Sequence, residues 1–266
     1  MTVPPFVTAD WLGDHPEAVL VDVRWYADGS PGRDAYERAH LPGAVYVDLD
    51  TVLAGPPGPA VGRHPLPSPS VFAAGLAAAG IGDDDVVVAY DDDSGVVAAR
   101  LVWMLRATGH AATVLDGGIT AWRGRVSTGE ETRPPAVFTE RPWPPSALVS
   151  IDEVPTLTLL DGRPAERYRG EVEPLDARPG HVPGAVSLPG RESSGPTGLL
   201  LTVPELRRRL LEAGVSDAGW ASSCGSGVVA CHTLLVAEHL GLPPGRLYVG
   251  SWSQWAATDR PAALGP

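Results

Sequence analysis

Short runs of apolar and β-branched residues alternate along the chain with longer stretches that favour helices. In the first half the runs fall at 19–23, 44–47, 86–90 and 113–115, and in the second half at 157–160, 185–188, 220–223 and 246–249. Strands that alternate with helical stretches are typical of parallel sheets covered by helices. The pattern therefore predicts an α/β fold in both halves of the chain.

Polar and proline residues mark where two of these helices begin. Thr202 is followed three residues later by Glu205, the spacing of a capping box, and this predicts a helix that extends through Leu211. Pro69 and Ser70 mark the start of the matching helix in the first half, which we expect to end before Gly80.

Four sequence blocks of the first half return in the same order in the second half. The first set is VLVDVRW at 19–25, AHLPGAVYV at 39–47, VVVAYDDDSGVVAARL at 86–101 and LDGGITAW at 115–122. The second set is TLLDGRP at 158–164, GHVPGAVSL at 180–188, WASSCGSGVVACHTL at 220–234 and YVGSWSQW at 248–255. We interpret the chain as a duplicated domain, with an N-terminal copy at 1–125, a proline-rich linker at 126–146 and a C-terminal copy at 147–266.

Composition narrows the classes of partner and chemistry. The chain has 266 residues, 44% of them hydrophobic and 20% charged, which is enough to bury a core in two domains of ordinary size or in one large domain. Its formal net charge of -12 argues against nucleic acid as a partner but leaves room for a small anionic substrate held by a local arginine. All 20 basic residues are arginines, so Schiff-base chemistry through a lysine is excluded.

The cysteines and the N-terminal residues bear on the cellular compartment. Cys224 and Cys231 are separated by a predicted loop and helix, too far apart for a disulfide, so no oxidising compartment is implied. The first basic residue is Arg24, and neither a signal peptide nor an apolar run of membrane-spanning length is apparent. We expect a cytoplasmic protein with no membrane partner.

The segment SSCGSGVVA at 222–230 is the strongest candidate for chemistry. Cys224 is followed by Gly225, Ser226 and Gly227, and an apolar helical stretch begins at Val228. Small residues let the backbone turn tightly, so that several N–H groups and the positive end of the helix can face the sulfur. Such an environment stabilises a thiolate, and we predict that Cys224 is a nucleophile.

Three other interpretations of this segment are weaker. A lone cysteine is commonly a small buried hydrophobic residue, although burial does not require flanking glycines. Gly225, Gly227 and Ala230 match a dinucleotide-binding fingerprint, but no acidic residue stands in the later region 247–250 where that fold needs one. A cysteine phosphatase needs an arginine six positions after the cysteine, where this chain has Ala230.

The duplication assigns the chemistry to one copy. Matching GVVA at 95–98 with GVVA at 227–230 sets Asp92 opposite Cys224, which predicts that the first copy has lost its nucleophile. Cys231, His232 and His239 suggest a metal at first, but the two histidines lie about 10 Å apart along a helix, too far for one ion. We expect no metal and no organic cofactor.

These features resemble the tandem-domain rhodanese-like sulfurtransferases, which have an active cysteine only in the second domain. CGSGV at 224–228 is most similar to the loop of the 3-mercaptopyruvate sulfurtransferases. Further agreement lies in GRDAYERAHLPGA at 32–44, LVWMLRATGH at 101–110, RYRGEVEP at 167–174, GHVPGAV at 180–186 and GSWSQW at 250–255.

The resemblance implies a reaction and a set of residues. Cys224 would take sulfur from a small anionic donor, 3-mercaptopyruvate, and pass it from a persulfide to a thiol, cyanide or a thioredoxin-like protein. The resemblance assigns donor binding to Arg167 and to four residues of the loop: Gly225, Gly227, Val228 and Val229. It also implies a proposed Ser-His-Asp set, formed by Ser226, His64 and Asp50. By contrast, Arg163 is predicted to form a structural salt bridge.

Some positions depart from the family pattern. Val229 replaces a threonine, and Leu175 stands near the position of a second donor-binding arginine, for which Arg178 or Arg169 are candidate replacements.

Two alternative functions stay open. One is a thiosulfate sulfurtransferase that uses the same cysteine, and the other is a non-enzymatic domain that carries a persulfide for a partner.

Overall fold

The computed structural model describes residues 3–266, which form two compact units. Unit 1 contains the chain up to Gly55 together with Pro67–Trp143 and Ser194–Leu200. Unit 2 contains Pro56–Leu66, Pro144–Ser193 and Leu201–Pro266. The units thus exchange two short segments relative to a simple division of the sequence into halves. Residues 56–66, which carry His64, belong to unit 2, and the proline-rich stretch 126–146 is divided between the units after Trp143.

Unit 1 is built on a sheet of five parallel strands in the order β1-β5-β4-β2-β3. Four of them match the predicted runs: β2 (Val19–Asp22), β3 (Val45–Tyr46), β4 (Val87–Tyr90) and β5 (Ala112–Leu115). Strand β1 (Phe6–Val7) was not predicted; it has two residues, and its register pairs Phe6 with Val114.

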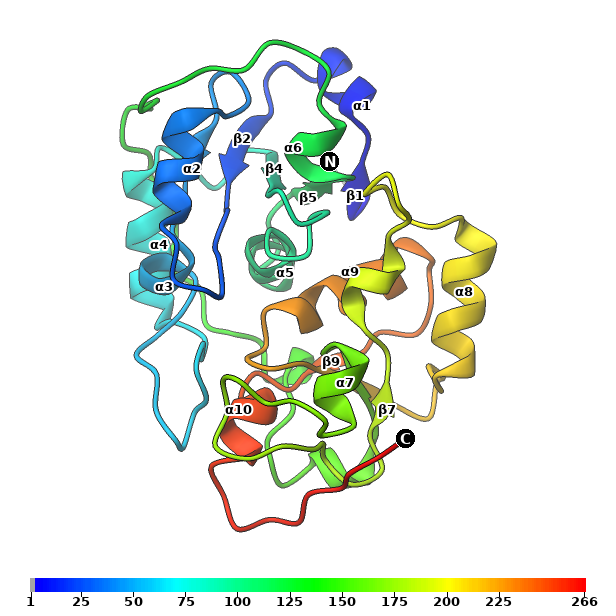
Figure 1. The fold of residues 1–266 in the computed structure, drawn as a ribbon. Helices are drawn as coiled ribbons and strands as arrows, with labels where there is room; N and C mark the ends of the chain where they lie inside the picture. The colour runs from blue at the N-terminus through cyan, green and yellow to red at the C-terminus, as the bar shows by residue number, and fades with distance from the viewer. Residues whose placement is uncertain (1–2) are drawn as a thin grey trace. The chain divides into compact units, whose positions relative to one another are not determined.

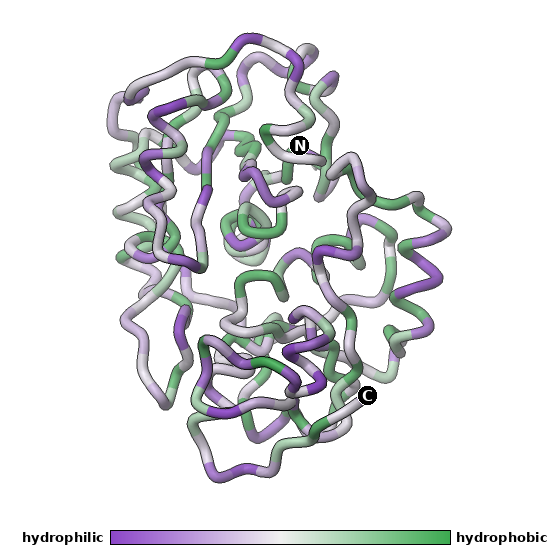
Figure 2. Tube along the Cα trace, in the orientation of Figure 1, coloured by the Kyte–Doolittle hydropathy of each residue, from purple (hydrophilic) through white to green (hydrophobic). Residues whose placement is uncertain are grey.

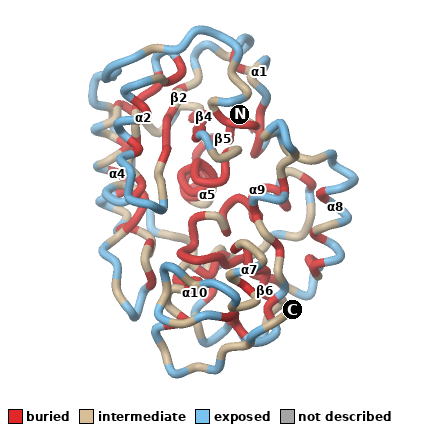
Figure 3. The backbone as a smooth tube through the Cα atoms, viewed as in Figure 1, coloured by how far each residue is buried: buried red, intermediate tan, exposed pale blue. Residues whose placement is uncertain are grey.

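Six helices accompany the strands within the described part of unit 1. They are α1 (Ala9–Asp14), α2 (Gly32–Arg38), α3 (Leu49–Val52), α4 (Pro69–Ala78), α5 (Ala99–Ala107) and α6 (Gly118–Ala121). The start of α4 at Pro69 agrees with the prediction, and the Ser68 hydroxyl caps it by accepting from the Val71 N–H at 3.2 Å. Helix α5 packs against β4 and β5 and is buried along most of its length (Figure 3).

Unit 2 repeats this plan with four parallel strands in the order β7-β6-β8-β9. The strands are β6 (Thr158–Asp161), β7 (Val186–Ser187), β8 (Trp220–Ser223) and β9 (Arg246–Leu247), all at predicted positions. The helices are α7 (Ala165–Tyr168), α8 (Val203–Glu212), α9 (Val229–His239) and α10 (Ser251–Trp255), with short 3-10 turns at Pro145–Ala147, Val154–Thr156 and Gly190–Ser193. Figure 1 labels most of these elements. Parallel sheets flanked by helices in both units confirm the predicted fold class.

The two long helices of unit 2 differ in character. Helix α8 is amphipathic: it opens with the predicted capping box of Thr202 and Glu205, buries Leu206 and Leu210, and carries both polar and apolar residues along its length (Figure 2). Helix α9 is buried at eight consecutive positions from Ala230 to Ala237 and packs against β8 and β9. Because α9 is buried on every side, its sequence is a nearly continuous apolar stretch. The same packing holds the start of the helix beside the sheet.

Within residues 3–266, no helix has both the length and the apolar character needed to cross a membrane.

Candidate active site

Cys224 lies at the carboxyl end of β8, between that strand and the start of α9. Strand β8 is an inner strand, paired with β6 on one side and β9 on the other. In parallel α/β sheets, ligands bind at the carboxyl ends of the strands, where the loops leading into helices gather. The predicted nucleophile therefore occupies the position that this fold class uses for chemistry.

The loop after Cys224 wraps its backbone around the sulfur. The Gly227 N–H donates to Cys224 Sγ at 3.1 Å, and α9 begins two residues later at Val229. Gly227 has φ +79°, and a Cβ on it would lie 2.5 Å from the Val249 carbonyl oxygen. Only glycine fits this turn, and the turn is what directs the amide at the sulfur.

The first turn of α10 fixes the loop from the opposite side. The amides of Trp252 and Ser253 donate to the carbonyl oxygens of Cys224 at 3.0 Å and Gly225 at 2.9 Å, and the Cys224 N–H donates to Ser251 Oγ at 3.1 Å. Cys224 is only 2% exposed. The thiol is therefore held in place before any substrate arrives, which is the preorganisation that electrostatic catalysis requires.

Ser226 and His64 form a close pair inside unit 2. Ser226 Oγ lies 2.7 Å from His64 Nδ1, and both residues are buried. The segment that carries His64 is anchored on α10, because Ser253 Oγ accepts from the Arg63 N–H at 3.0 Å and Gln254 Nε2 donates to the Ala60 carbonyl at 2.5 Å. The pairing of this serine with this histidine is thus built by one unit from segments 162 residues apart.

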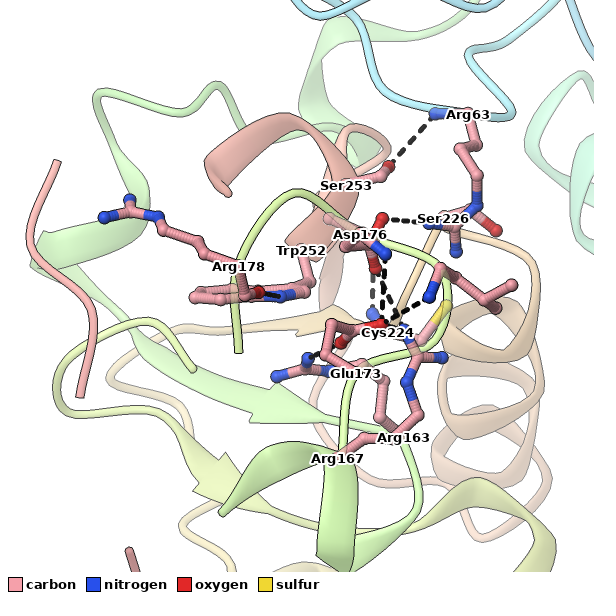
Figure 4. A network of polar contacts seen from close by, with 12 residues as sticks. Arg63, Arg163, Arg167, Glu173, Asp176, Arg178, Cys224, Ser226, Trp252 and Ser253 are labelled. Carbon is pink, nitrogen blue, oxygen red and sulfur yellow. Dashed lines mark hydrogen bonds and ion pairs between the residues drawn. The ribbon is translucent and has the colours of Figure 1, made fainter. Parts of the chain in front are cut away.

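Two guanidinium groups lie beside Gly225, the residue that follows the cysteine. Arg63 Nη2 is 2.9 Å and Arg167 Nη1 is 3.4 Å from the position that a Cβ on Gly225 would occupy. Figure 4 labels both arginines around Cys224. Arg167 was predicted for this region from the family resemblance, whereas Arg63 was not. The available signal for Arg63 was its position directly before His64.

The arginines belong to a chain of alternating charges. Asp161 pairs with Arg163 at 2.7 Å, as predicted for that arginine, and Arg163 reaches Glu173 at 3.5 Å. Arg167 Nη2 then binds Glu173 at 2.6 Å and Asp176 at 2.9 Å, and Asp176 also pairs with Arg63 Nη1. The side chains of Glu173 and Asp176 are only 3% exposed. Burial raises the pKa of Asp176, and the two arginines oppose this rise.

The remaining predicted residues have varied surroundings. Asp50 lies in unit 1, where its carboxylate accepts from Trp25 Nε1 at 3.0 Å. Val228 is buried, and the Val229 side chain approaches the backbone of Gly162 and Gly190.

Neither proposed replacement for the second donor-binding arginine is directed at the loop. Arg178 points away from Cys224 in Figure 4 and donates to the carbonyl oxygens of Trp255 and Arg260. Arg169 pairs with the exposed carboxylate of Glu171 at 2.7 Å.

His232, on α9, is part of the core. His232 is 0% exposed, and burial lowers its pKa to about 4, so the ring is neutral at physiological pH. Among residues 3–266, no group of three or more histidine, cysteine, aspartate and glutamate side chains is arranged to hold a metal ion.

Comparison with known proteins assigns the family. The family model described as the rhodanese-like domain matches the chain twice, at residues 8–125 and 145–258. The chain belongs to the rhodanese-like family. Each of the two structural units contains the core of one of these matches, and only the second copy carries the cysteine loop.

Relatives of full length extend this assignment to an activity. The chain is 39% identical over its whole length to a Pseudomonas aeruginosa protein provisionally named a 3-mercaptopyruvate sulfurtransferase, with 100% of both chains covered. It is 36% identical to a Mycobacterium tuberculosis protein provisionally named a thiosulfate sulfurtransferase, over 92% of this chain and 90% of the relative. The solved 3-mercaptopyruvate sulfurtransferase from Leishmania major superposes with a TM-score of 0.86 at 32% identity, covering 97% of this chain and 75% of that one. This rhodanese-like protein is therefore an enzyme, a sulfurtransferase.

Proposed function

We propose that this sulfurtransferase takes sulfur from 3-mercaptopyruvate onto Cys224 and passes it to a thiol or to cyanide. The observation that carries the proposal is the combination in the loop that starts at Cys224: an amide that donates to Cys224 Sγ at 3.1 Å, a Ser226–His64 pair at 2.7 Å and two guanidinium groups beside Gly225. The names of the P. aeruginosa and L. major relatives support the same donor.

The first half-reaction needs a nucleophile and a place for one proton. The Cys224 thiolate attacks the donor sulfur, the bond between that sulfur and C3 of the donor breaks, and its electron pair goes to C3 as the enolate of pyruvate. The thiol proton of the donor then moves to C3, which leaves pyruvate and a Cys224 persulfide anion. In the second half-reaction, an acceptor thiolate or cyanide attacks the outer sulfur and restores the Cys224 thiolate.

The loop supplies electrostatic stabilisation for both anions on the cysteine. The Gly227 amide already donates to Sγ, and the N-terminus of α9 adds its dipole to the amides of the loop. Arg63 and Arg167 would bind the donor carboxylate with one terminal nitrogen each, because charge-assisted hydrogen bonds from guanidinium groups to carboxylates are strong.

Ser226 and His64 would move the proton. The hydroxyl of Ser226 donates to His64 Nδ1 when the ring carries its proton on Nε2, so the pair can take the thiol proton and return it to C3. Asp50 remains our predicted third member of this set.

Thiosulfate is the alternative donor, and the M. tuberculosis relative's name favours it. Its transfer to Cys224 releases sulfite, and no proton has to move to carbon in that step. The absence of charged side chains in Gly225, Ser226 and Gly227 argues for the uncharged keto group and single carboxylate of 3-mercaptopyruvate instead.

Steady-state transfer to cyanide, with the two donors compared, tests the proposal. We expect kcat/KM to favour 3-mercaptopyruvate at least tenfold, and we expect Cys224→Ser to abolish turnover with either donor. His64→Asn should lower kcat with 3-mercaptopyruvate by about 100-fold, the usual contribution of a positioned general acid and base, and should affect thiosulfate far less. Equal use of both donors, or an equal effect of His64→Asn on both, would contradict this assignment.

We also propose a cytoplasmic location, where a thiol acceptor such as a thioredoxin-like protein stays reduced. Replacing cyanide with reduced thioredoxin in the same assay tests this acceptor. Turnover at a rate comparable to that with cyanide is the expected result, and no turnover would exclude it.

A further inference from the structure

Asp176 is a buried carboxylate that already occupies both arginines next to the catalytic loop. It pairs with Arg63 Nη1 through Oδ1 and with Arg167 Nη2 through Oδ2, the latter at 2.9 Å. Its position is fixed by Glu173, whose Oε1 accepts from the amides of Leu175 and Asp176, both at 3.1 Å. Asp176 therefore bridges the two guanidinium groups.

The nitrogen atoms that face Gly225 are not the ones that Asp176 uses. Arg63 Nη2 and Arg167 Nη1 lie closest to the position that a Cβ on Gly225 would occupy, at 2.9 and 3.4 Å, whereas Asp176 binds Arg63 Nη1 and Arg167 Nη2, the latter 3.9 Å from that position. Each guanidinium thus holds Asp176 with one terminal nitrogen and has its other terminal nitrogen nearer to the loop that follows Cys224. Two such nitrogens can bind one carboxylate.

The local charge determines which anions this arrangement favours. The network contains three arginines and three carboxylates, so its formal net charge is zero: Arg63, Arg163, Arg167, Asp161, Glu173 and Asp176. A neutral network attracts a monoanion through directed hydrogen bonds but offers little additional attraction to a second negative charge. Removing one carboxylate would leave a net charge of +1 beside the nucleophile.

We propose that Asp176 is a specificity-determining residue, which selects monoanionic carboxylate donors over dianionic ones such as thiosulfate. This inference rests on the proposed function, because it concerns how the same site chooses its donor. Asp176 acts through Arg63 and Arg167 and does not touch the reacting sulfur. Its carboxylate keeps the two guanidinium groups oriented and cancels one of their charges.

Asp176→Asn tests the proposal, because asparagine keeps the size of the side chain and one acceptor oxygen while removing the charge. We expect the ratio of kcat/KM for thiosulfate to kcat/KM for 3-mercaptopyruvate to rise about tenfold. The change should come mainly from a lower KM for thiosulfate. Glu171→Gln is the matched control, since it removes one negative charge from the same loop at an exposed ion pair with Arg169, and its ratio should stay within twofold of wild type.

A second measurement does not depend on turnover. Sulfate and pyruvate, a dianion and a monoanion that cannot donate sulfur, are titrated for their protection of Cys224 from alkylation by iodoacetamide. Asp176→Asn should strengthen protection by sulfate about tenfold relative to pyruvate, and Asp176→Glu, which restores the charge, should return the ratio toward wild type. An unchanged protection ratio in folded Asp176→Asn overturns the proposal.

The two measurements also separate the inference from the proposed function. If wild type turned over neither donor, the proposed function would fail, while the protection ratio would still decide the role of Asp176. If wild type preferred 3-mercaptopyruvate but Asp176→Asn left both ratios unchanged, the proposed function would stand and the role of Asp176 would be refuted. Because both readouts are ratios, a general loss of folded protein cancels.

Discussion

The loop at the carboxyl end of β4 in unit 1 and the loop at the carboxyl end of β8 in unit 2 have the same backbone design with different occupants. Gly95 and Gly227 stand at matching positions with φ +81° and +79°. In unit 1 the Asp91 carboxylate is completely buried and accepts hydrogen bonds from four backbone amides, those of Asp93, Gly95, Val97 and Ala98, at 2.7 to 2.8 Å. In unit 2 an amide of the equivalent loop donates to the Cys224 sulfur.

The backbone amides of the unit 1 loop form what we call a cradle, and the comparison shows that a carboxylate of the chain itself can fill it while the fold is retained. Asp91 matches Ser223 and Asp92 matches Cys224, so unit 1 fills its own cradle with a carboxylate from the residue before the position of the proposed nucleophile. Asp92 is also engaged, because its carboxylate accepts from the Tyr26 hydroxyl at 2.6 Å. Burial, reinforced by this bond, raises the pKa of Tyr26 to about 12.

The largest expected effect comes from moving the nucleophile between the two loops. Cys224→Ser should reduce sulfur transfer to cyanide at least about 1,000-fold, and adding Asp92→Cys should not restore it. The reason is that Asp91 keeps the four amides and adds a negative charge next to the new thiol. Recovery of more than about one hundredth of wild-type kcat in the double variant would contradict the view that the unit 1 cradle is filled.

Stability should depend on the two matching residues to different degrees. Asp91→Ala leaves four buried amides without their acceptor and should lower the unfolding free energy of unit 1 by about 3 kcal/mol. Ser223→Ala loses one bond to the Leu160 carbonyl at 3.3 Å and should cost unit 2 about 1 kcal/mol. Hydrogen exchange followed by mass spectrometry resolves the two units, and equal losses of protection in both variants would refute the difference.

Lowering the pH should change the stability of the two units in opposite directions, because each unit contains one buried group with a shifted pKa: Asp91 in unit 1 and His232 in unit 2. Burial raises the pKa of Asp91 from 3.8 to about 6 despite its amide bonds, so folded unit 1 holds a proton that the unfolded chain lacks at pH 4 to 6. Its contribution to stability therefore decreases as pH rises through that window. Burial lowers the pKa of His232 from 6.5 to about 4, so the unfolded chain holds the extra proton and unit 2 loses stability as pH falls through 6.5 to 4.

Single variants isolate each contribution in urea unfolding at pH 6.5 and pH 4.5. Compared with wild type, His232→Gln should lose about 2 kcal/mol less stability on acidification, because its side chain does not titrate. Asp91→Asn should lose more than wild type, because it lacks the stabilising proton uptake. Parallel pH profiles for wild type and both variants would show that neither group is linked to folding as described.

The sequence was sufficient to predict the strands from β2 to β9, because parallel strands buried on both faces form compact apolar runs in the sequence. It also led to the prediction that Cys224 is the nucleophile, since glycines on both sides of a serine have no role in burying a thiol; that prediction stays a proposal. It could not predict β1, a two-residue strand with too few residues to show a pattern.

The features that the sequence did not predict, namely the place of Arg63 and the role of Asp91, both depend on the tertiary structure of the chain. Arg63 reaches the cysteine loop because residues 56–66 fold onto unit 2, and no local pattern records that exchange. Matching Asp92 with Cys224 was correct in register, but the occupant of the unit 1 cradle is its neighbour Asp91. Side-chain direction decides between adjacent carboxylates, and it depends on tertiary packing that sequence alone does not specify.

The smallest expected effect concerns a position where the two units have the same tyrosine contacts but differ in the charge of the preceding residue. Tyr36 and Tyr168 match, because their hydroxyls donate to the carbonyls of Ala44 at 2.9 Å and Ala185 at 2.6 Å, and their rings stack on His40 and His181. The residue before each tyrosine is Ala35 in unit 1 and Arg167 in unit 2.

Arg167→Ala makes unit 2 resemble unit 1 at this position. It should raise the KM for 3-mercaptopyruvate about tenfold and leave the KM for cyanide within twofold, because one of two guanidinium groups beside Gly225 is lost. Arg169→Ala, which removes an exposed arginine paired with Glu171, serves as the control and should change neither constant. If Arg167→Ala raised both Michaelis constants equally, the arginine would act through the loop's structure, and the contrast with Ala35 would concern packing rather than donor binding.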